Sequence, residues 1–219
     1  IDILDEVLAD YPYSVDKRLD TSVFPKLIWE VQHCETDAHF IQRLTEEWGI
    51  SYFFEHDGSH HRLVLVSESG AWRKFPSGAY PALSIYPQGF KIDQEHLTRF
   101  EPIIRLRTGK VTFKDYDPRQ PKADLTTSDS LPRDTLFSEF ERYEYEPGLY
   151  DSRDVGNLHA RIHTEERRAK GRRMRGVGNL RGVAAGNTYH ITNHDHDALN
   201  REVLIVSTDL MLEDVGIHS

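Results

Sequence analysis

Residues 29–56 have the sequence WEVQHCETDAHFIQRLTEEWGISYFFEH and predict the clearest folded unit of the chain. Thr36 can cap a helix, and Asp37 adds a negative charge in the first turn, where the helix macrodipole favours it. Apolar side chains then recur at helical spacing, at Phe40, Ile41, Leu44 and Trp48. Gly49 follows as a stop signal, so the pattern predicts an amphipathic helix of about three turns.

A β-hairpin is predicted directly after this helix. The aromatic run Ile50–Glu55 and the alternating run Arg62–Val66 both favour strands. Asp57 and Gly58 lie between them, and this pair favours the positive φ angles of a tight hairpin turn. A further strand is predicted before the helix, at Lys26–Val31.

The rest of the chain indicates a β-rich α+β fold with two or three helices. Strand candidates lie at residues 103–106, 110–113, 137–145, 188–192 and 203–210. A short helix is expected over residues 1–9, and a longer one from a Ser152 cap to about Lys170. The side chains expected on the buried side of the longer helix are Val155, Leu158, Ile162 and Ala169. Sustained alternation of strands and helices is absent, which disfavours a doubly wound parallel sheet.

Length, charge and cysteine content exclude several classes of protein. The 219 residues suffice for about one to two domains, and no run of 18 apolar residues predicts a transmembrane helix. Lys and Arg number 27 against 36 Asp and Glu, and the net charge of −9 disfavours binding to nucleic-acid phosphates. Cys34 is the single cysteine, so an intrachain disulfide is impossible. The chain begins with Ile1, and we expect it to be a piece of a longer protein.

The segment 190–197 is the first candidate for a chemical site. It contains two kinds of metal ligand, imidazoles and carboxylates, at His190, His194, Asp195, His196 and Asp197. A loop of Asn and Asp residues between two strands is also an ordinary turn, and the sequence favours that interpretation. A metal-dependent enzyme that uses His194 and His196 stays open as an alternative.

Three smaller features favour structural roles. Asp115 and Asp117 space two carboxylates as some metal-dependent transferases do, but the segment more simply ends a strand in a turn. His159 and His163 lie four residues apart on the predicted longer helix, without the Glu of the metalloprotease motif. Cys34 is interpreted as a small buried side chain rather than a nucleophile.

Basic residues dominate the segment Arg167–Arg181, which holds seven basic side chains and no acidic one. Such a segment could meet an acidic partner or a phosphate. No aromatic residue lies between the basic ones, so a stacking platform for single-stranded nucleic acid is absent. The pattern favours a solvated or subunit-facing surface over a nucleic-acid site.

The segment 29–56 resembles the hub region of the valine-glycine-repeat (VgrG) spike proteins of bacterial type VI secretion. The residues that carry the resemblance are Glu35-Thr36-Asp37, Phe40-Ile41, Arg43-Leu44, Glu46-Glu47, Gly49-Ile50 and Tyr52-Phe53-Phe54. Three more matches follow in the family's order, at Asp115-Tyr116-Asp117, Tyr143–Tyr150 and Leu199-Asn200-Arg201-Glu202. The chain departs from the family's pattern at His33-Cys34, Trp48 and His194-Asp195.

The resemblance implies a fold like that of a contractile-phage tail hub, with β-barrel subdomains and an inserted α+β domain. Residues 1–89 would be the inserted α+β domain, and residues 90–116 the returning strands of the first β-barrel. Residues 117–219 would form the second β-barrel with one helix. The chain would be incomplete at both ends, because the start of the first barrel and the family's spike lie outside it.

The resemblance also implies a structural, non-enzymatic function with no catalytic residue, metal or cofactor. The chain would form a homotrimer that caps a hexameric tube protein and carries the puncturing spike. Baseplate components and effectors would be further partners, nucleic acid would not, and only the assembled spike would contact a membrane. Assembly in the bacterial cytoplasm would precede secretion or delivery to target cells. The tail hub of a contractile phage is a second alternative.

Overall fold

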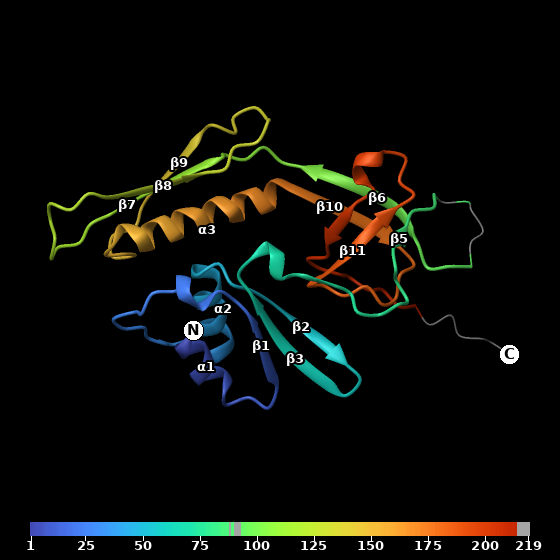
Figure 1. Ribbon diagram of the computed structural model, residues 1–219, viewed down its shortest axis with the longest axis horizontal. Coiled ribbons are helices and arrows are strands. Elements are labelled where there is room, and N and C mark those ends of the chain that lie inside the picture. The colour runs from blue at the N-terminus through green and yellow to red at the C-terminus, as the bar shows by residue number, and fades with distance from the viewer. Residues whose placement is uncertain (88, 90–92, 214–219) are drawn as a thin grey trace. The chain divides into compact units, whose positions relative to one another are not determined.

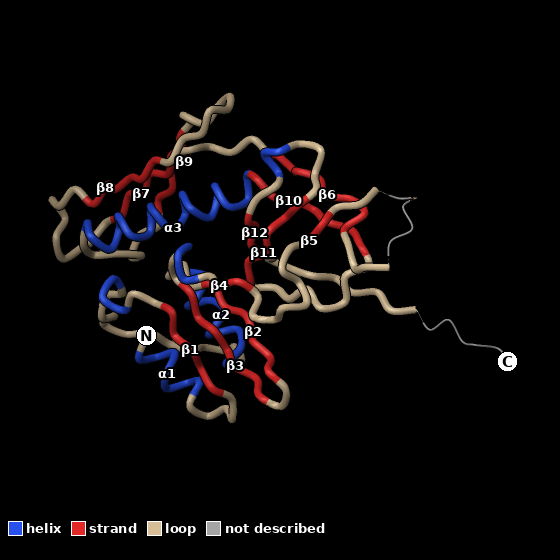
Figure 2. Tube along the Cα trace, turned by 45° about the vertical axis from the view of Figure 1, so that its right-hand side comes forward, coloured by secondary structure: helices blue, strands red, loops and turns tan. Residues whose placement is uncertain are grey.

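The computed structural model describes residues 1–87, 89 and 93–213 (Figure 1). The α-helices of this part are α1 (Asp2–Leu8), α2 (Asp37–Glu47) and α3 (Arg153–Gly171). Short 3₁₀ helices occur at Thr21–Val23, Ser69–Ala71 and Asp197–Leu199. None of the helices in these ranges has the length and apolar character that crossing a bilayer requires. Most of the other regular structure is β-strand (Figure 2), so the predicted β-rich α+β class is confirmed.

The chain folds into two compact units, and each unit is built from three separate stretches of sequence. Unit 1 contains residues 1–12, 20–51 and 102–174. Unit 2 contains residues 13–19, 52–101 and 175–219, within the described ranges. Strands β6 (Leu97–Ile104) and β10 (Arg172–Gly178) pair with each other, and the division between the units falls within both strands.

A three-stranded sheet with α3 packed against it forms the centre of unit 1. The order is β8 (Leu125–Ser130), β7 (Lys110–Asp115) and β9 (Glu141–Tyr145), with β8 antiparallel and β9 parallel to β7. Helix α3 packs on β7 and β8 (Figure 1). The core consists of Val111, Phe113, Leu125, Tyr150 and Ala160. Burying one large apolar side chain contributes about 1.5–3 kcal/mol, so this layer is a main source of the unit's stability.

Helix α3 starts where the sequence predicts, but its buried side differs from the prediction. The Ser152 hydroxyl accepts a hydrogen bond from the backbone N–H of Val155 at 3.5 Å, which confirms the predicted cap. Ala169 is exposed, and the other side chains of the predicted buried side are only half-buried. The buried positions are instead Gly156, His159, Ala160, Thr164, Arg168 and Gly171. Glycine is needed at position 156 because α3 lies so close to its neighbours that a Cβ there would be 2.5 Å from the Tyr150 ring.

Helix α2 confirms the prediction for the quoted segment. The Thr36 hydroxyl accepts a hydrogen bond from the backbone N–H of His39 at 3.3 Å, and Phe40 and Leu44 are buried. Trp48 ends the helix and packs on His159 of α3, with ring centroids 4.9 Å apart. Helix α3 is therefore covered by the sheet on one side and by the end of α2 on another.

The strand predicted at Lys26–Val31 is wrong, because the segment has no ladder partner among the described residues. The Arg43 side chain of α2 fixes it instead. Its guanidinium lies 2.8 Å from a carboxylate oxygen of Glu30 and donates to the Val31 carbonyl at 3.1 Å. The segment is irregular, and Ile28 and Trp29 are 78% and 77% exposed.

Unit 2 contains the predicted hairpin, formed by β2 (Ser51–Asp57) and β3 (His60–Val66), with Gly58 at φ +57°. Strand β1 (Ser14–Arg18) joins the other edge of β3 in parallel. Phe53, Val64 and Val66 form the core of this layer. The predicted turn and both predicted strands are therefore confirmed.

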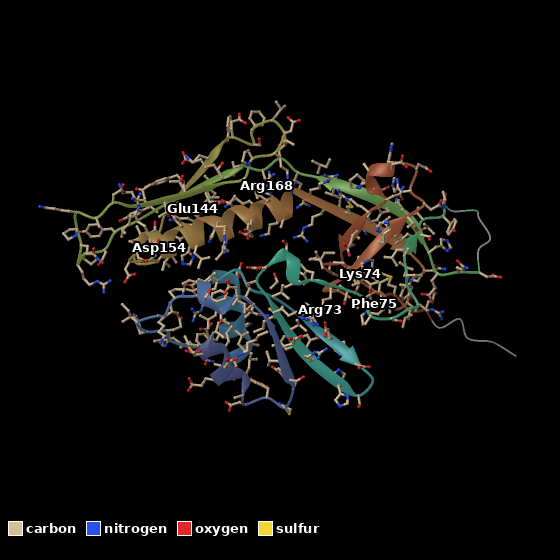
Figure 3. All side chains as sticks on the ribbon, in the orientation of Figure 1. Arg73, Lys74, Phe75, Glu144, Asp154 and Arg168 are labelled. Carbon is tan, nitrogen blue, oxygen red and sulfur yellow. The ribbon has the colours of Figure 1, made fainter. Side chains whose placement is uncertain are left out.

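The second sheet of unit 2 is arranged around β11 (Asn187–Thr192). Its neighbours are β12 (Glu202–Leu204), β4 (Arg73–Lys74) and β5 (Leu83–Ser84). Phe75, labelled in Figure 3, stacks on Tyr189 with ring centroids 5.3 Å apart. The strand expected over residues 203–210 covers only Glu202–Leu204, because its pairing with β11 ends there. The strand expected over residues 137–145 likewise covers only Glu141–Tyr145.

Gly186→Ala should destabilise the protein by about 2–4 kcal/mol. Gly186 has φ +82°, and an added Cβ would lie 2.1 Å from the Phe53 ring. The measurement is urea unfolding monitored by circular dichroism. Gly58→Ala is the matched control, since Gly58 has φ +57° but no atom within 4 Å of the added Cβ. Equal losses in the two variants would contradict the packing argument.

The buried His159 should make unit 1 sensitive to acid. Burial, together with the nearby charge of His163, lowers the pKa of His159 to about 4 from 6.5. The unfolded chain therefore binds this proton first, so stability is complete above pH 6.5 and falls as the pH drops toward 4. The free energy of unfolding should fall by about 3 kcal/mol across this pH range through His159 alone.

His159→Leu removes this titration and should flatten the pH dependence of the free energy of unfolding between pH 6.5 and 4. Urea unfolding of both proteins at four pH values across this window measures the difference. An unchanged slope in the variant would show that other groups cause the acid sensitivity.

Candidate functional site

The histidine loop between β11 and β12 is organised by its own hydrogen bonds. The backbone N–H of His196 donates to Nδ1 of His194 at 2.9 Å. Because Nδ1 accepts, Nε2 of His194 carries the hydrogen and donates to the Phe100 carbonyl at 3.2 Å. The Asn200 side chain bonds the backbone N–H and C=O of His194 at 2.8 and 2.9 Å. Both nitrogens of the candidate ligand His194 therefore hold the loop together.

A third ligand for the proposed metal is not in place. Within residues 1–87, 89 and 93–213, no three His, Cys, Asp or Glu side chains gather closely enough to hold a metal ion. The rings of His194 and His196 stack at 5.8 Å between centroids. The geometry of this loop fits the turn that the sequence favours.

Asp115, the last residue of β7, and Asp117, just after it, both bind backbone N–H groups of nearby loops. Asp115 is 3% exposed and accepts hydrogen bonds from the backbone N–H groups of Gly148 and Tyr150, both at 2.7 Å. Asp117 accepts from the backbone N–H and Nε of Arg119 at 2.9 and 3.0 Å. These hydrogen bonds lower the pKa of Asp117. The predicted turn is confirmed, and the hydrogen bonds of both carboxylates stabilise loops.

The remaining candidates are also separated in the structure. His159 packs on Trp48, whereas His163 meets the edge of Phe113 at 4.9 Å. The prediction of a buried Cys34 is wrong, because its thiol is exposed. Cys34 has φ +54° and lies in a bend rather than a strand, which brings its sulfur within 3.4 Å of His33 Nε2.

Unit 1 exposes a group of large apolar side chains on the loop of residues 131–140, here called the apolar loop. The exposed members are Leu131, Leu136, Phe137 and Phe140. Phe137 has φ +64°, an uncommon conformation for a bulky residue, and its ring packs on Phe140 at 5.0 Å. Leu136, Phe137 and Phe140 line a shallow hollow with Asp134, Thr135 and Glu139. Clustered exposed apolar groups are typical of interaction surfaces.

Backbone contacts hold the apolar loop in place. The N–H of Leu131 donates to the Gly109 carbonyl at 2.7 Å. A Cβ on Gly109 would lie 2.0 Å from the Ser138 carbonyl oxygen, so only glycine permits this approach. The Ser138 hydroxyl donates to the Arg133 carbonyl. The loop thus presents its apolar side chains outward from a fixed backbone.

Sequence reasoning missed this surface. The pattern predicts a strand over residues 137–145 and no exposed apolar surface. The available signal was Leu136, Phe137 and Phe140 within a polar segment that follows Pro132. Such a pattern has neither strand nor helix period, which is typical of an exposed apolar loop.

Comparison with known proteins identifies the relatives of this chain. The family model described as phage tail baseplate hub (GPD) matches residues 1–216. The type VI secretion system spike protein VgrG1a of Pseudomonas aeruginosa is 32% identical over 87% of this chain and 30% of its own length. VgrG1b of the same organism is 28% identical over 95% of this chain and 28% of its own length. The actin cross-linking toxin VgrG1 of Vibrio cholerae is 26% identical over 81% of this chain and 16% of its own length.

Solved structures show the same fold at low sequence identity. The 43 kDa tail protein of prophage MuSo2 from Shewanella oneidensis has a TM-score of 0.58 and 14% identity, over 94% of this chain and 59% of that one. A tail protein from Neisseria meningitidis has a TM-score of 0.55 and 16% identity, over 93% and 58%. The predicted tail-hub-like fold is therefore confirmed.

The resemblance to VgrG spike proteins is likewise confirmed, although this chain spans only about 30% of VgrG1a. The match to the hub family covers nearly the whole chain, and the fold agrees with it. This chain belongs to the phage tail baseplate hub (GPD) family.

Proposed function

We propose that this chain is the hub region of a type VI secretion spike and acts as a structural, non-enzymatic part of it. The observation that carries the proposal is the family match over residues 1–216, together with relatives named as type VI secretion spike proteins. The site geometry supports it, because Asp115, Asp117 and His194 are engaged in hydrogen bonds that hold loops.

The hub would be a homotrimer that caps a hexameric tube protein and carries the spike. Each chain would contribute an inserted domain (residues 1–89), the returning strands of a first barrel (90–116) and a second barrel (117–219). Two similar barrels in each of three chains would match the six-fold symmetry of the tube. Exposed apolar groups such as Trp29 and Phe137 would be covered by subunits in such an assembly.

Baseplate components and effectors would be the other partners, and the assembled spike alone would contact a membrane. The protein would assemble in the bacterial cytoplasm and then leave the cell. Nucleic acid is not a proposed partner, since the net charge is −9.

A contractile-phage tail hub is the second candidate, and the likeness in fold to a prophage tail protein favours it. The mechanical role would be the same in both settings. Release of the full-length protein into the medium that depends on a type VI sheath would support the secretion setting. Recovery of the protein only in phage particles would support the alternative.

Light scattering of the purified protein should give the mass of three chains of 25.4 kDa each. Metal analysis of the same peak should find no stoichiometric metal. If the 219-residue chain is monomeric, the full-length protein that contains it is measured in the same way. A monomeric full-length protein would contradict the trimer. One tightly bound transition metal per chain, lost in His194→Ala, would favour the metal-dependent enzyme instead.

If the apolar loop lies at the subunit contact, Phe137→Ser with Phe140→Ser should shift the trimer toward monomer, since the buried apolar area shrinks. Tyr116→Ser is the matched control, because Tyr116 is an exposed aromatic residue of unit 1 outside the apolar loop. Equal masses for the double variant and the control would place the apolar loop outside the subunit contact.

A further inference from the structure

Arginine side chains gather around the C-terminal end of α3 in unit 1. Arg133 donates from Nη2 to the Arg168 carbonyl at 3.2 Å. The position that a Cβ would take on Gly171, the last residue of α3, is 3.5 Å from Arg107 Cγ and 3.6 Å from Arg133 Nη1. Arg107, Arg133 and Arg168, here called the arginine cluster, therefore come from three separate segments that meet at the end of α3. Figure 3 labels Arg168 at this end of α3.

The arginine cluster has no carboxylate partner. Within the described ranges, no Asp or Glu lies within ion-pair distance of Arg107, Arg133 or Arg168. The adjacent Arg167 does have one, at 3.3 Å from Glu144. Among the described residues, an acid is therefore present beside one arginine of this helix end but absent beside the cluster.

Two donors of the cluster are buried without an acceptor. Arg168 is only 8% exposed, and its Nε has no hydrogen-bond partner. Nε of Arg107 is also buried and unpartnered. Burial and the neighbouring charge of Arg133 lower the pKa of Arg168. Buried donors of this kind are costly, and an unpaired one in a native fold calls for an explanation.

The helix end alone does not explain the cluster. Cations near a helix C-terminus interact favourably with the macrodipole, and the contact of Arg133 with the Arg168 carbonyl is of this kind. Arg133 alone provides this favourable interaction with the helix end. The macrodipole therefore does not explain why the Arg168 guanidinium is buried beside it without an acceptor.

We propose that the arginine cluster is a binding site for carboxylate groups of an acidic segment in a protein partner. Guanidinium groups present forked donors that match carboxylate oxygens in pairs. Ile104, Leu106 and Leu131 lie within three residues of Arg107 or Arg133 in the sequence and are exposed and apolar. A surface that combines cations with apolar side chains fits a peptide of acidic and apolar residues better than a nucleic acid, which would need a stripe of cations along a backbone.

Arg18 of unit 2 shows how the chain pairs a buried guanidinium with its own carboxylates. Its side chain is 6% exposed, and its Nη2 pairs with the partly exposed Asp16 at 2.9 Å and Glu55 at 2.7 Å, although its Nη1 has no partner among the described residues. The arginine cluster has the same kind of donor without the acids. A partner would supply them.

Fluorescence anisotropy tests the site with a labelled peptide of three Leu-Glu-Glu repeats. We expect the purified chain to bind this peptide, and Arg168→Met and Arg133→Met each to weaken binding at least tenfold. Arg161→Met is the matched control on the same helix, since Arg161 is exposed and faces Glu165. Binding should also fall as salt rises. No binding by the unchanged chain, or equal binding of the peptide with Gln in place of Glu, would overturn the proposal.

Thermal unfolding distinguishes a binding role from a purely structural one. In the absence of peptide, Arg168→Met should raise Tm, because it removes an uncompensated buried charge, and the peptide should no longer raise Tm further. A lower Tm with unchanged peptide binding would assign Arg168 to the helix end and overturn the proposal. Arg168→Lys keeps the positive charge but loses the paired donors of the guanidinium, so weakened peptide binding by a folded variant would support the proposal. Tighter, Arg168-dependent binding of a labelled oligothymidine would replace the protein partner with nucleic acid.

Discussion

The buried carboxylate of Asp115 ties together the parts of unit 1. It ends the central strand β7 and accepts hydrogen bonds from the backbone N–H groups of Gly148 and Tyr150. Those residues lead directly into α3, and the Tyr150 hydroxyl donates to the Leu125 carbonyl at 2.6 Å. The start of α3 is thus fixed against two strands at once, and the packing of the helix along the sheet follows from that position.

The sequence predicts the local elements well because their signals are local. The cap at Thr36, the turn at Gly58 and the cap at Ser152 each depend on a few neighbouring residues, and the structure has all three. The buried side of α3 could not be predicted in this way. Its stripe holds glycine, alanine, histidine and arginine, and only the close approach of the sheet and of Trp48 explains why these residues are buried.

The candidate surfaces depend on contacts between distant segments. Gly109 fixes the apolar loop through Leu131 and Ser138, which lie 22 and 29 residues further along the chain. The segments of Arg107, Arg133 and Arg168 come together only after β7, β8 and α3 have packed. The basic character of residues 167–181 was visible in the sequence, but the division into a paired Arg167 and an unpaired Arg168 was not. One residue of helical rotation separates a stabilising ion pair from an uncompensated charge.

The interleaving of the two units affects how the protein can fold during synthesis. Unit 1 needs residues 102–174 before its sheet and α3 exist, and unit 2 needs β11, which begins at Asn187. The first hundred residues therefore leave the ribosome without a complete core for either unit. The layer of β1, β2 and β3 has its core residues within this stretch, but other apolar side chains, such as Trp48, stay uncovered until α3 has been made. Neither unit can be isolated as one continuous piece of sequence.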